Sequence, residues 1–132
     1  MHRDMYQEHI LDLYKEPLNF GDLKDKTEEK RGYNPLCGDD FIMQVKIKNN
    51  KIEDIKFKGT GCAISIAASS LLTDHVKGKT VDQVKKIKAE DLIKLMGIEI
   101  GPVRMKCALL GLETLHKIVF KKEGEATTEE DE

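Results

Sequence analysis

The alternation of hydrophobic and polar positions predicts a helix, a pair of strands and then more helices along the 132-residue chain. Residues 5–15 carry apolar side chains at helical spacing, and that pattern stops before Pro17. Residues 17–33 are polar, charged and contain glycine, which predicts a long, mobile loop.

A β-hairpin is predicted next. Residues 41–48 alternate strictly, with Phe41, Met43, Val45 and Ile47 on one face. Asn49 and Asn50 then supply a short turn before a second strand that contains Ile52, Ile55 and Phe57. The step from Ile52 to Ile55 breaks the alternation, so we expect a register irregularity near Glu53 and Asp54.

The second half of the chain is helical in pattern. We expect helices over 63–76, 80–87 and 89–96, and a last helix that opens at Gly101-Pro102 and runs to about Lys122. Because the strands come first and most helices follow, the fold class is α+β, a small antiparallel sheet packed against several helices.

Composition and charge indicate a single small domain and argue against nucleic-acid binding. With 39% hydrophobic residues the chain supports one modest core, which we place in a domain of residues 1–122. Residues 123–132 hold six acids and no base, and we expect an acidic, disordered tail there. The remaining 22 basic and 18 acidic residues leave a body of charge about +4. Aromatic residues make up 5%, with no Trp, which argues against nucleic-acid binding.

Neither a membrane span nor a signal peptide is expected, since no apolar run approaches the roughly 18 residues a span needs. We therefore expect a cytoplasmic protein.

The chain has three cysteines, Cys37, Cys62 and Cys107. A secreted disulfide framework would need more cysteines and an even number of them. The three cysteines form no CxxC pair, and they lie 25 and 45 residues apart, so only the fold could bring them into one site.

Each cysteine has an unusual setting. Cys37 lies in a turn before the first strand, Cys62 follows Gly59-Thr60-Gly61 and precedes a helix, and Cys107 lies in the first turns of the last helix. A helix N-terminus favours a thiolate, and Arg104 and Lys106 would add to that effect at Cys107. A single buried cysteine is usually only core, but core cysteines do not need turns and glycines.

Asp39 is a candidate fourth ligand; the simpler interpretation of Asp39 is a turn or cap acid. We assign the four histidines, His2, His9, His75 and His116, to surface or core roles. Three thiolates and a carboxylate suit zinc or iron–sulfur ligation. Since a carboxylate is a poor ligand for soft ions, such a site favours release and transfer of what it holds.

Three blocks of sequence resemble the iron–sulfur scaffold family that includes IscU, the N-terminal domain of NifU, and SufU. These blocks are Asn34-Pro35-Leu36-Cys37-Gly38-Asp39, Gly59-Thr60-Gly61-Cys62-Ala63-Ile64-Ser65 with Ala68-Ser69, and Pro102-Val103-Arg104-Met105-Lys106-Cys107-Ala108. The resemblance implies that the cysteines converge at one end of an IscU/NifU-like fold. It implies that Cys37, Asp39, Cys62 and Cys107 hold a transient [2Fe–2S] cluster or iron, with zinc as the alternative occupant. It also implies a cysteine desulfurase as sulfur donor, and downstream carriers or apo-proteins as recipients.

The chain departs from each relative in part. IscU has a His at the position of Lys106, whereas SufU has a Lys there and an Arg matched by Arg104. SufU also carries an insertion between its second and third cysteines for which this chain has no room. The IscU chaperone motif becomes Ile100-Gly101-Pro102-Val103-Arg104, which argues against a dedicated Hsp70 partner. Lys106 is either a solvated lysine that tunes Cys107, which we favour, or a partner of a carboxylate such as Asp39.

Three functions follow from these features. The first is a non-enzymatic scaffold that binds iron, accepts sulfur, with Cys107 as the candidate acceptor, and passes on a labile cluster. The second is a zinc-dependent, SufU-like sulfur acceptor in which Cys37 carries the persulfide, an activity resembling a sulfurtransferase. The third, from another class, is a structural zinc interaction module.

Overall fold

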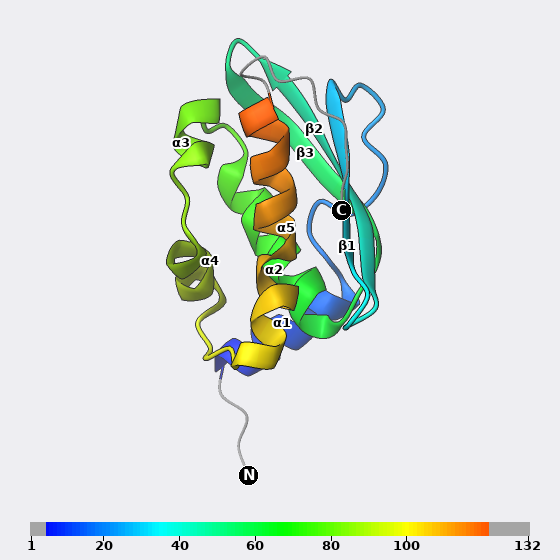
Figure 1. Ribbon diagram of the computed structural model, residues 1–132, viewed down its shortest axis with the longest axis vertical. Helices are drawn as coiled ribbons and strands as arrows, with labels where there is room; N and C mark the ends of the chain where they lie inside the picture. The colour runs from blue at the N-terminus through cyan, green and yellow to red at the C-terminus, as the bar shows by residue number, and fades with distance from the viewer. Residues whose placement is uncertain (1–4, 122–132) are drawn as a thin grey trace.

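A three-stranded antiparallel sheet with helices packed on one side makes up the computed structural model, which describes residues 5–121 (Figure 1). The sheet has the order β1-β2-β3. The elements, in chain order, are α1 (Met5–Lys15), β1 (Glu28–Asn34), β2 (Asp39–Lys48), β3 (Lys51–Thr60), α2 (Ala63–Val76), α3 (Val81–Lys85), α4 (Ala89–Met96) and α5 (Pro102–Lys121). The α+β class expected from the sequence is confirmed.

The hairpin of β2 and β3 follows the predicted pattern in detail. Asn49 and Asn50 form its turn with φ of 53° and 62°, the left-handed backbone that such a two-residue turn requires. Lys46 pairs with Asp54 and Ile47 pairs with Ile52, so one residue of β3 is extra at this point. This bulge is the expected irregularity, and it lets Ile52 and Ile55 both point into the core, where both are fully buried.

The prediction of a long loop over residues 17–33 is wrong for the second part of that segment. There β1 pairs with β2 along the whole length of β1. The hydrophobic pattern does not reveal this strand, because its two buried positions are Gly32 and Asn34, neither of which has an apolar side chain. A Cβ at residue 32 would lie 2.9 Å from a ring carbon of Phe41 and would crowd Thr114 of α5. Gly32 therefore lets α5 lie close against the sheet.

The first part of that segment, residues 17–23, is a bonded strap and not the mobile loop we expected. The backbone N–H of Leu18 donates to Ser70 Oγ at 3.1 Å, and Asn19 Nδ2 donates to Thr73 Oγ1 at 3.1 Å. The Gly21 N–H donates to the Phe57 carbonyl at 2.9 Å, which attaches the strap to β3. The strap thus joins α1, the sheet and α2.

The helices match the expected ranges closely. α1, α2 and α4 have the predicted bounds, whereas α3 is shorter than 80–87 because Thr80 serves as its N-cap and accepts from the Gln83 N–H at 3.1 Å. The domain boundary and the acidic tail expected at 123–132 lie outside the described residues. Across residues 5–121, no helix is both long enough and apolar enough to span a bilayer.

The core lies between the sheet and the layer formed by α2 and α5. Its largest fully buried apolar side chains from the sheet are Phe41, Met43, Val45, Ile52, Ile55 and Phe57. Helical residues complete it, among them Leu72, Leu92, Met96, Leu115 and Ile118. Because α2 packs against α1, α4 and α5, its N-terminus is held at one end of the sheet.

Candidate metal centre

Three segments that are distant in sequence meet at one end of the molecule: the turn between β1 and β2, the start of α2 and the start of α5 (Figure 1). Potential ligand atoms of Cys37, Asp39 and Cys107 all lie within 4.8 Å of one another. Such mutual proximity is what a single ion or a small cluster needs. The structure therefore brings together three of the four residues expected to form a site.

The turn that carries Cys37 is organised by Asn34. The Cys37 N–H donates to the Asn34 carbonyl at 3.3 Å, and the Leu36 N–H donates to Asn34 Oδ1 at 3.3 Å. Asn34 Nδ2 also lies 3.9 Å from Cys107 Sγ, and this side chain is buried. Sequence reasoning missed this contribution of Asn34; the Asn-Pro pair was the available signal. Gly38, with φ of +73°, then turns the chain from Cys37 into Asp39.

Cys62 occupies the N-cap of α2, as its position before the helix predicted. Its backbone is extended, with φ −79° and ψ 170°, and its thiol makes no capping hydrogen bond. Its N–H instead donates to Asp39 Oδ1 at 2.9 Å. The Cys62 side chain also interacts with the Cys107 thiol, so Cys62 adjoins the other three residues.

Cys107 differs from the expectation of an activated thiolate at a helix start. It is the sixth residue of α5 and is fully buried. Burial raises the pKa of the Cys107 thiol well above its ordinary value, and hydrogen bonding with Cys37 and Cys62 adds to the rise. The helix dipole is outweighed because desolvation of a buried thiolate costs more than a helix terminus returns. Any metal that binds Cys107 must therefore displace a proton.

Arg104 and Lys106 stand differently toward the thiols. Hydrogen bonding with Cys107 raises the pKa of the Arg104 guanidinium, and the charges of Cys62, Cys107 and Cys37 raise it further. Arg104 is thus an exposed cation at the rim of the cysteine cluster. Lys106 is exposed as well, and within residues 5–121 it forms no ion pair with Asp39.

The Asp39 carboxylate has two oxygens in contrasting surroundings. Oδ1 accepts from the Cys62 N–H and from Ser65 Oγ at 3.0 Å. Oδ2 is fully buried and has no hydrogen-bond partner among the described residues. A buried carboxylate oxygen without a partner is costly unless something positive reaches it. Together with the neighbouring thiols, this oxygen fits a cation or an iron–sulfur cargo.

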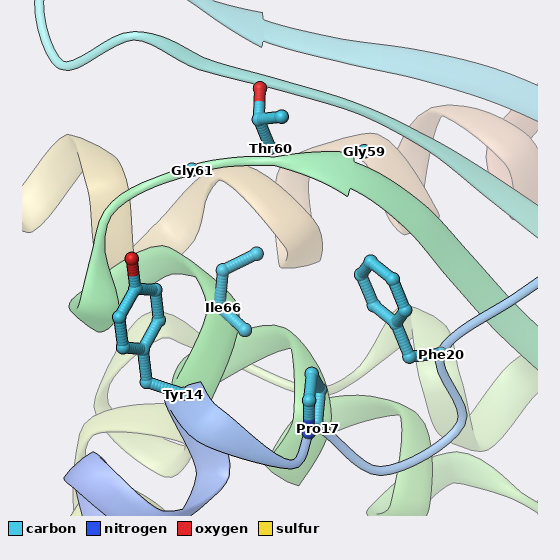
Figure 2. A pocket seen from close by; sticks show the side chains of 7 residues that line it. All are labelled: Tyr14, Pro17, Phe20, Gly59, Thr60, Gly61 and Ile66. Atoms are coloured by element: carbon cyan, nitrogen blue, oxygen red, sulfur yellow. The ribbon is translucent and has the colours of Figure 1, made fainter.

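A shallow pocket of about 360 Å³ lies on the other side of the Gly59–Gly61 segment (Figure 2). Tyr14 from the last turn of α1, Pro17 and Phe20 from the strap and Ile66 from α2 line it, together with Gly59–Gly61. Figure 2 shows Tyr14 and Phe20 flanking Ile66 beneath the segment that leads to Cys62. The pocket is mostly apolar and brings no additional ligand to the cysteines.

The histidines lie apart from the cysteine cluster, in line with the surface or core roles expected. His116 of α5 packs against α3, with its Nε2 3.1 Å from the Val84 carbonyl. His75 is partly buried on α2, and His9 is exposed on α1. His2 lies outside the described residues.

The structure is a small α+β domain in which cysteine thiols and a buried carboxylate gather at one end, an arrangement that could hold a metal ion. The NifU-like N terminal domain profile matches residues 5–128, and the chain belongs to this family.

Relatives with assigned roles agree with that membership. The chain is 39% identical to the iron–sulfur cluster assembly scaffold protein IscU of Aquifex aeolicus over 113 residues, covering 84% of this chain and 71% of that one. It is 35% identical to the zinc-dependent sulfurtransferase SufU of Bacillus subtilis, covering 91% and 92%. That second alignment runs over 137 residues although this chain has 132, so SufU contains residues with no counterpart here.

The fold has a solved counterpart. The crystal structure of a putative iron–sulfur cluster assembly scaffold protein for the SUF system, from Fervidobacterium islandicum AW-1, superposes with a TM-score of 0.71 at 26% identity. The match covers 85% of this chain and 94% of the other. The IscU/NifU-like architecture expected from the three sequence blocks is confirmed.

Proposed function

We propose that this protein is an iron–sulfur cluster assembly scaffold that binds iron, accepts sulfur from a cysteine desulfurase, and transfers a labile [2Fe–2S] cluster. The observation that carries the proposal is the approach of Cys37, Asp39 and Cys107 within 4.8 Å, beside the N-cap residue Cys62. Thiolates are the ligands that iron–sulfur clusters require, and the single carboxylate makes the set weaker than four thiolates. A weaker set suits a cargo that must leave.

Sulfur would arrive by exchange. A scaffold thiolate attacks the terminal sulfur of the donor's persulfide, a new S–S bond forms on the scaffold cysteine, and the donor cysteine leaves as a thiolate. Cys37 and Cys62 are partly exposed, whereas Cys107 is buried. Exposure therefore disfavours Cys107 as the first acceptor; we propose Cys37 for that step, and Cys107 as the thiol that receives sulfur once the site has opened.

A second function, sulfur transfer at a zinc site, has its own support. Arg104 lies beside the thiols at a position where the sequence resemblance implies an Arg in SufU, and the zinc-dependent sulfurtransferase SufU of Bacillus subtilis is 35% identical to this chain. Cys37, Asp39, Cys62 and Cys107 would then hold the zinc, which would fix the site's geometry and lower the pKa of the thiols that bind it. Cys37, the most accessible ligand of the turn, would leave the ion to carry the persulfide.

An anaerobic assembly assay separates the two functions. The protein is mixed with Fe²⁺, cysteine and a cysteine desulfurase, and visible absorbance, bound iron, sulfide and zinc are measured. We expect stoichiometric iron and sulfide with a thiolate-to-iron absorption band. Retained zinc, no cluster and faster desulfurase turnover would instead establish sulfur transfer. If removal of zinc unfolds the chain and no cysteine is ever persulfidated, the site is a structural zinc module and both functions are wrong.

A further inference from the structure

The carboxylate of Asp39 is held by hydrogen bonds to its Oδ1, and the residue that donates one of them besides Cys62 has no assigned role. Asp39 Oδ1 accepts two hydrogen bonds, from the Cys62 N–H at 2.9 Å and from Ser65 Oγ at 3.0 Å. Both donors belong to the first turn of α2. With two donors on Oδ1 and no donor to Oδ2 among residues 5–121, the carboxylate is oriented and one oxygen is left for a ligand.

Ser65 is suited to this task by position and burial. It lies three residues after the N-cap Cys62 and is fully buried, so water does not compete for its hydroxyl. The same hydroxyl lies 3.2 Å from the Cys62 carbonyl, so its single proton is shared between two acceptors, of which Asp39 Oδ1 is the nearer at 3.0 Å. The positive end of the α2 dipole supports the negative carboxylate at the same place.

Gly61 makes room for the arrangement. A Cβ at residue 61 would collide with Ser65 Oγ and would lie 3.1 Å from Asp39 Oδ1. The backbone of the segment before Cys62 therefore passes directly over the Ser65–Asp39 hydrogen bond. Any side chain at residue 61 would push the hydroxyl away from the carboxylate.

We infer that Ser65 is a positioning residue of the metal centre: it holds Asp39 so that a single oxygen, Oδ2, faces the bound ion or cluster. The inference rests on the proposed function, since it gives Asp39 the role of ligand. Ser65 does not itself touch the ion. Partners of this kind orient a ligand and raise its affinity for the metal, and their loss typically lowers metal affinity about 10- to 100-fold.

The test uses zinc alone, in competition with a chromophoric chelator, on the full-length protein. We expect Ser65→Ala to lower zinc affinity about tenfold or more. Ser69→Ala is the matched control, because Ser69 is equally buried one turn later on α2 but its hydroxyl has no partner among the described residues. The control should leave zinc affinity unchanged. Ser65→Thr keeps a hydroxyl at this position and should restore most of the affinity.

A double-mutant cycle separates positioning from a general structural effect. If Ser65 acts through Asp39, Ser65→Ala should have no further effect on zinc affinity in an Asp39→Ala background. An equal loss in both backgrounds would overturn the inference. Circular dichroism of the metal-free variants shows that each is folded under the assay conditions. If Ser65→Ala does not fold, Gly61→Ala displaces the hydroxyl with Ser65 in place and should lower zinc affinity in the same direction.

The outcomes distinguish this inference from the proposed function. A parent protein that binds neither zinc nor iron would contradict both. A parent protein that binds zinc, with Ser65→Ala equal to Ser69→Ala, would overturn the role of Ser65 and leave the proposed function standing.

Discussion

At the scale of single residues, the site depends on a few atoms that tolerate no additional volume. Gly61 is one such point, because its missing side chain leaves space for the Ser65 hydroxyl and the Asp39 carboxylate. Asp39 is another, since its Oδ1 accepts two hydrogen bonds while its Oδ2 accepts none from the part of the chain that the structure describes. Side-chain changes here should therefore affect both folding stability and ligand binding.

Gly61→Ala should destabilise the metal-free protein by about 1–3 kcal/mol, the usual cost of forcing additional volume into a packed site. Urea unfolding followed by circular dichroism measures the effect. The loss should be smaller when Ser65→Ala is also present, because the hydroxyl that meets the new Cβ is then gone. Equal losses in both backgrounds would show that the collision is not the cause.

The sequence singled out the candidate ligand residues but not the residues that position them. Cys37, Asp39, Cys62 and Cys107 stood out by residue type and by neighbouring glycines. Ser65 and Asn34 did not, because a serine in a first helical turn and an asparagine before a proline are ordinary features. The high pKa of Cys107 was also missed, since burial at that position depends on how α5 packs on the sheet.

At the scale of elements, α2 connects the site to the rest of the fold. Its N-terminus holds Cys62 and Ser65, and two hydroxyls further along accept hydrogen bonds from the strap, residues 17–23. Helix periodicity revealed α2 in full, whereas β1 was missed because strand recognition relies on alternating apolar residues that Gly32 and Asn34 replace. The strap was missed because its hydrogen bonds join residues about fifty positions apart.

Two adjacent serines of α2 offer a matched pair. Ser70→Ala should destabilise the protein by about 1 kcal/mol, because the Leu18 N–H that donates to Ser70 Oγ loses its acceptor. Ser69→Ala should change the stability by less than about 0.5 kcal/mol or increase it, because the Ser69 hydroxyl is buried without a partner among the described residues. Urea unfolding of the metal-free variants measures both. A larger loss for Ser69→Ala than for Ser70→Ala would contradict the assigned bonds.

At the scale of the whole molecule, charge and protonation set the conditions under which the fold and its complexes persist. Basic residues outnumber acidic ones over 1–122, and six acids follow in 123–132. The exposed Arg104 places one of the cations at the cysteine end. His75 is partly buried on α2 near Lys79 and Asp91. These surroundings lower the pKa of its imidazole.

Folding stability should fall as the pH decreases below 6.5, the ordinary pKa of histidine. Burial lowers the pKa of His75, and the charge of Lys79 lowers it further, so the unfolded chain takes up this proton first and acid favours unfolding. His75→Gln should flatten the dependence of unfolding free energy on pH between about 7 and 5. An unchanged profile would assign the acid sensitivity to other groups.

The complex with a cysteine desulfurase should weaken as salt concentration rises, because a basic body favours an acidic docking face and salt screens the attraction. Isothermal titration at several ionic strengths measures the dissociation constant. A chain that ends at Lys122 is the control: without the six acids of 123–132 it should bind more tightly at low salt. A dissociation constant that does not change with salt would show that charge attraction does not contribute to desulfurase binding.

The two outer edges of the sheet differ in a way that bears on aggregation. The edge of β3 is already occupied: residues 19–21 bond to Phe57, and Ile52 bonds to the segment of Gly78 and Lys79. Among the described strands, β1 alone leaves an outer edge for another strand, and it begins with four consecutive charged residues, Glu28 to Arg31. Charged edges resist strand addition. The charged edge of β1 therefore protects the protein from polymerising through its own sheet.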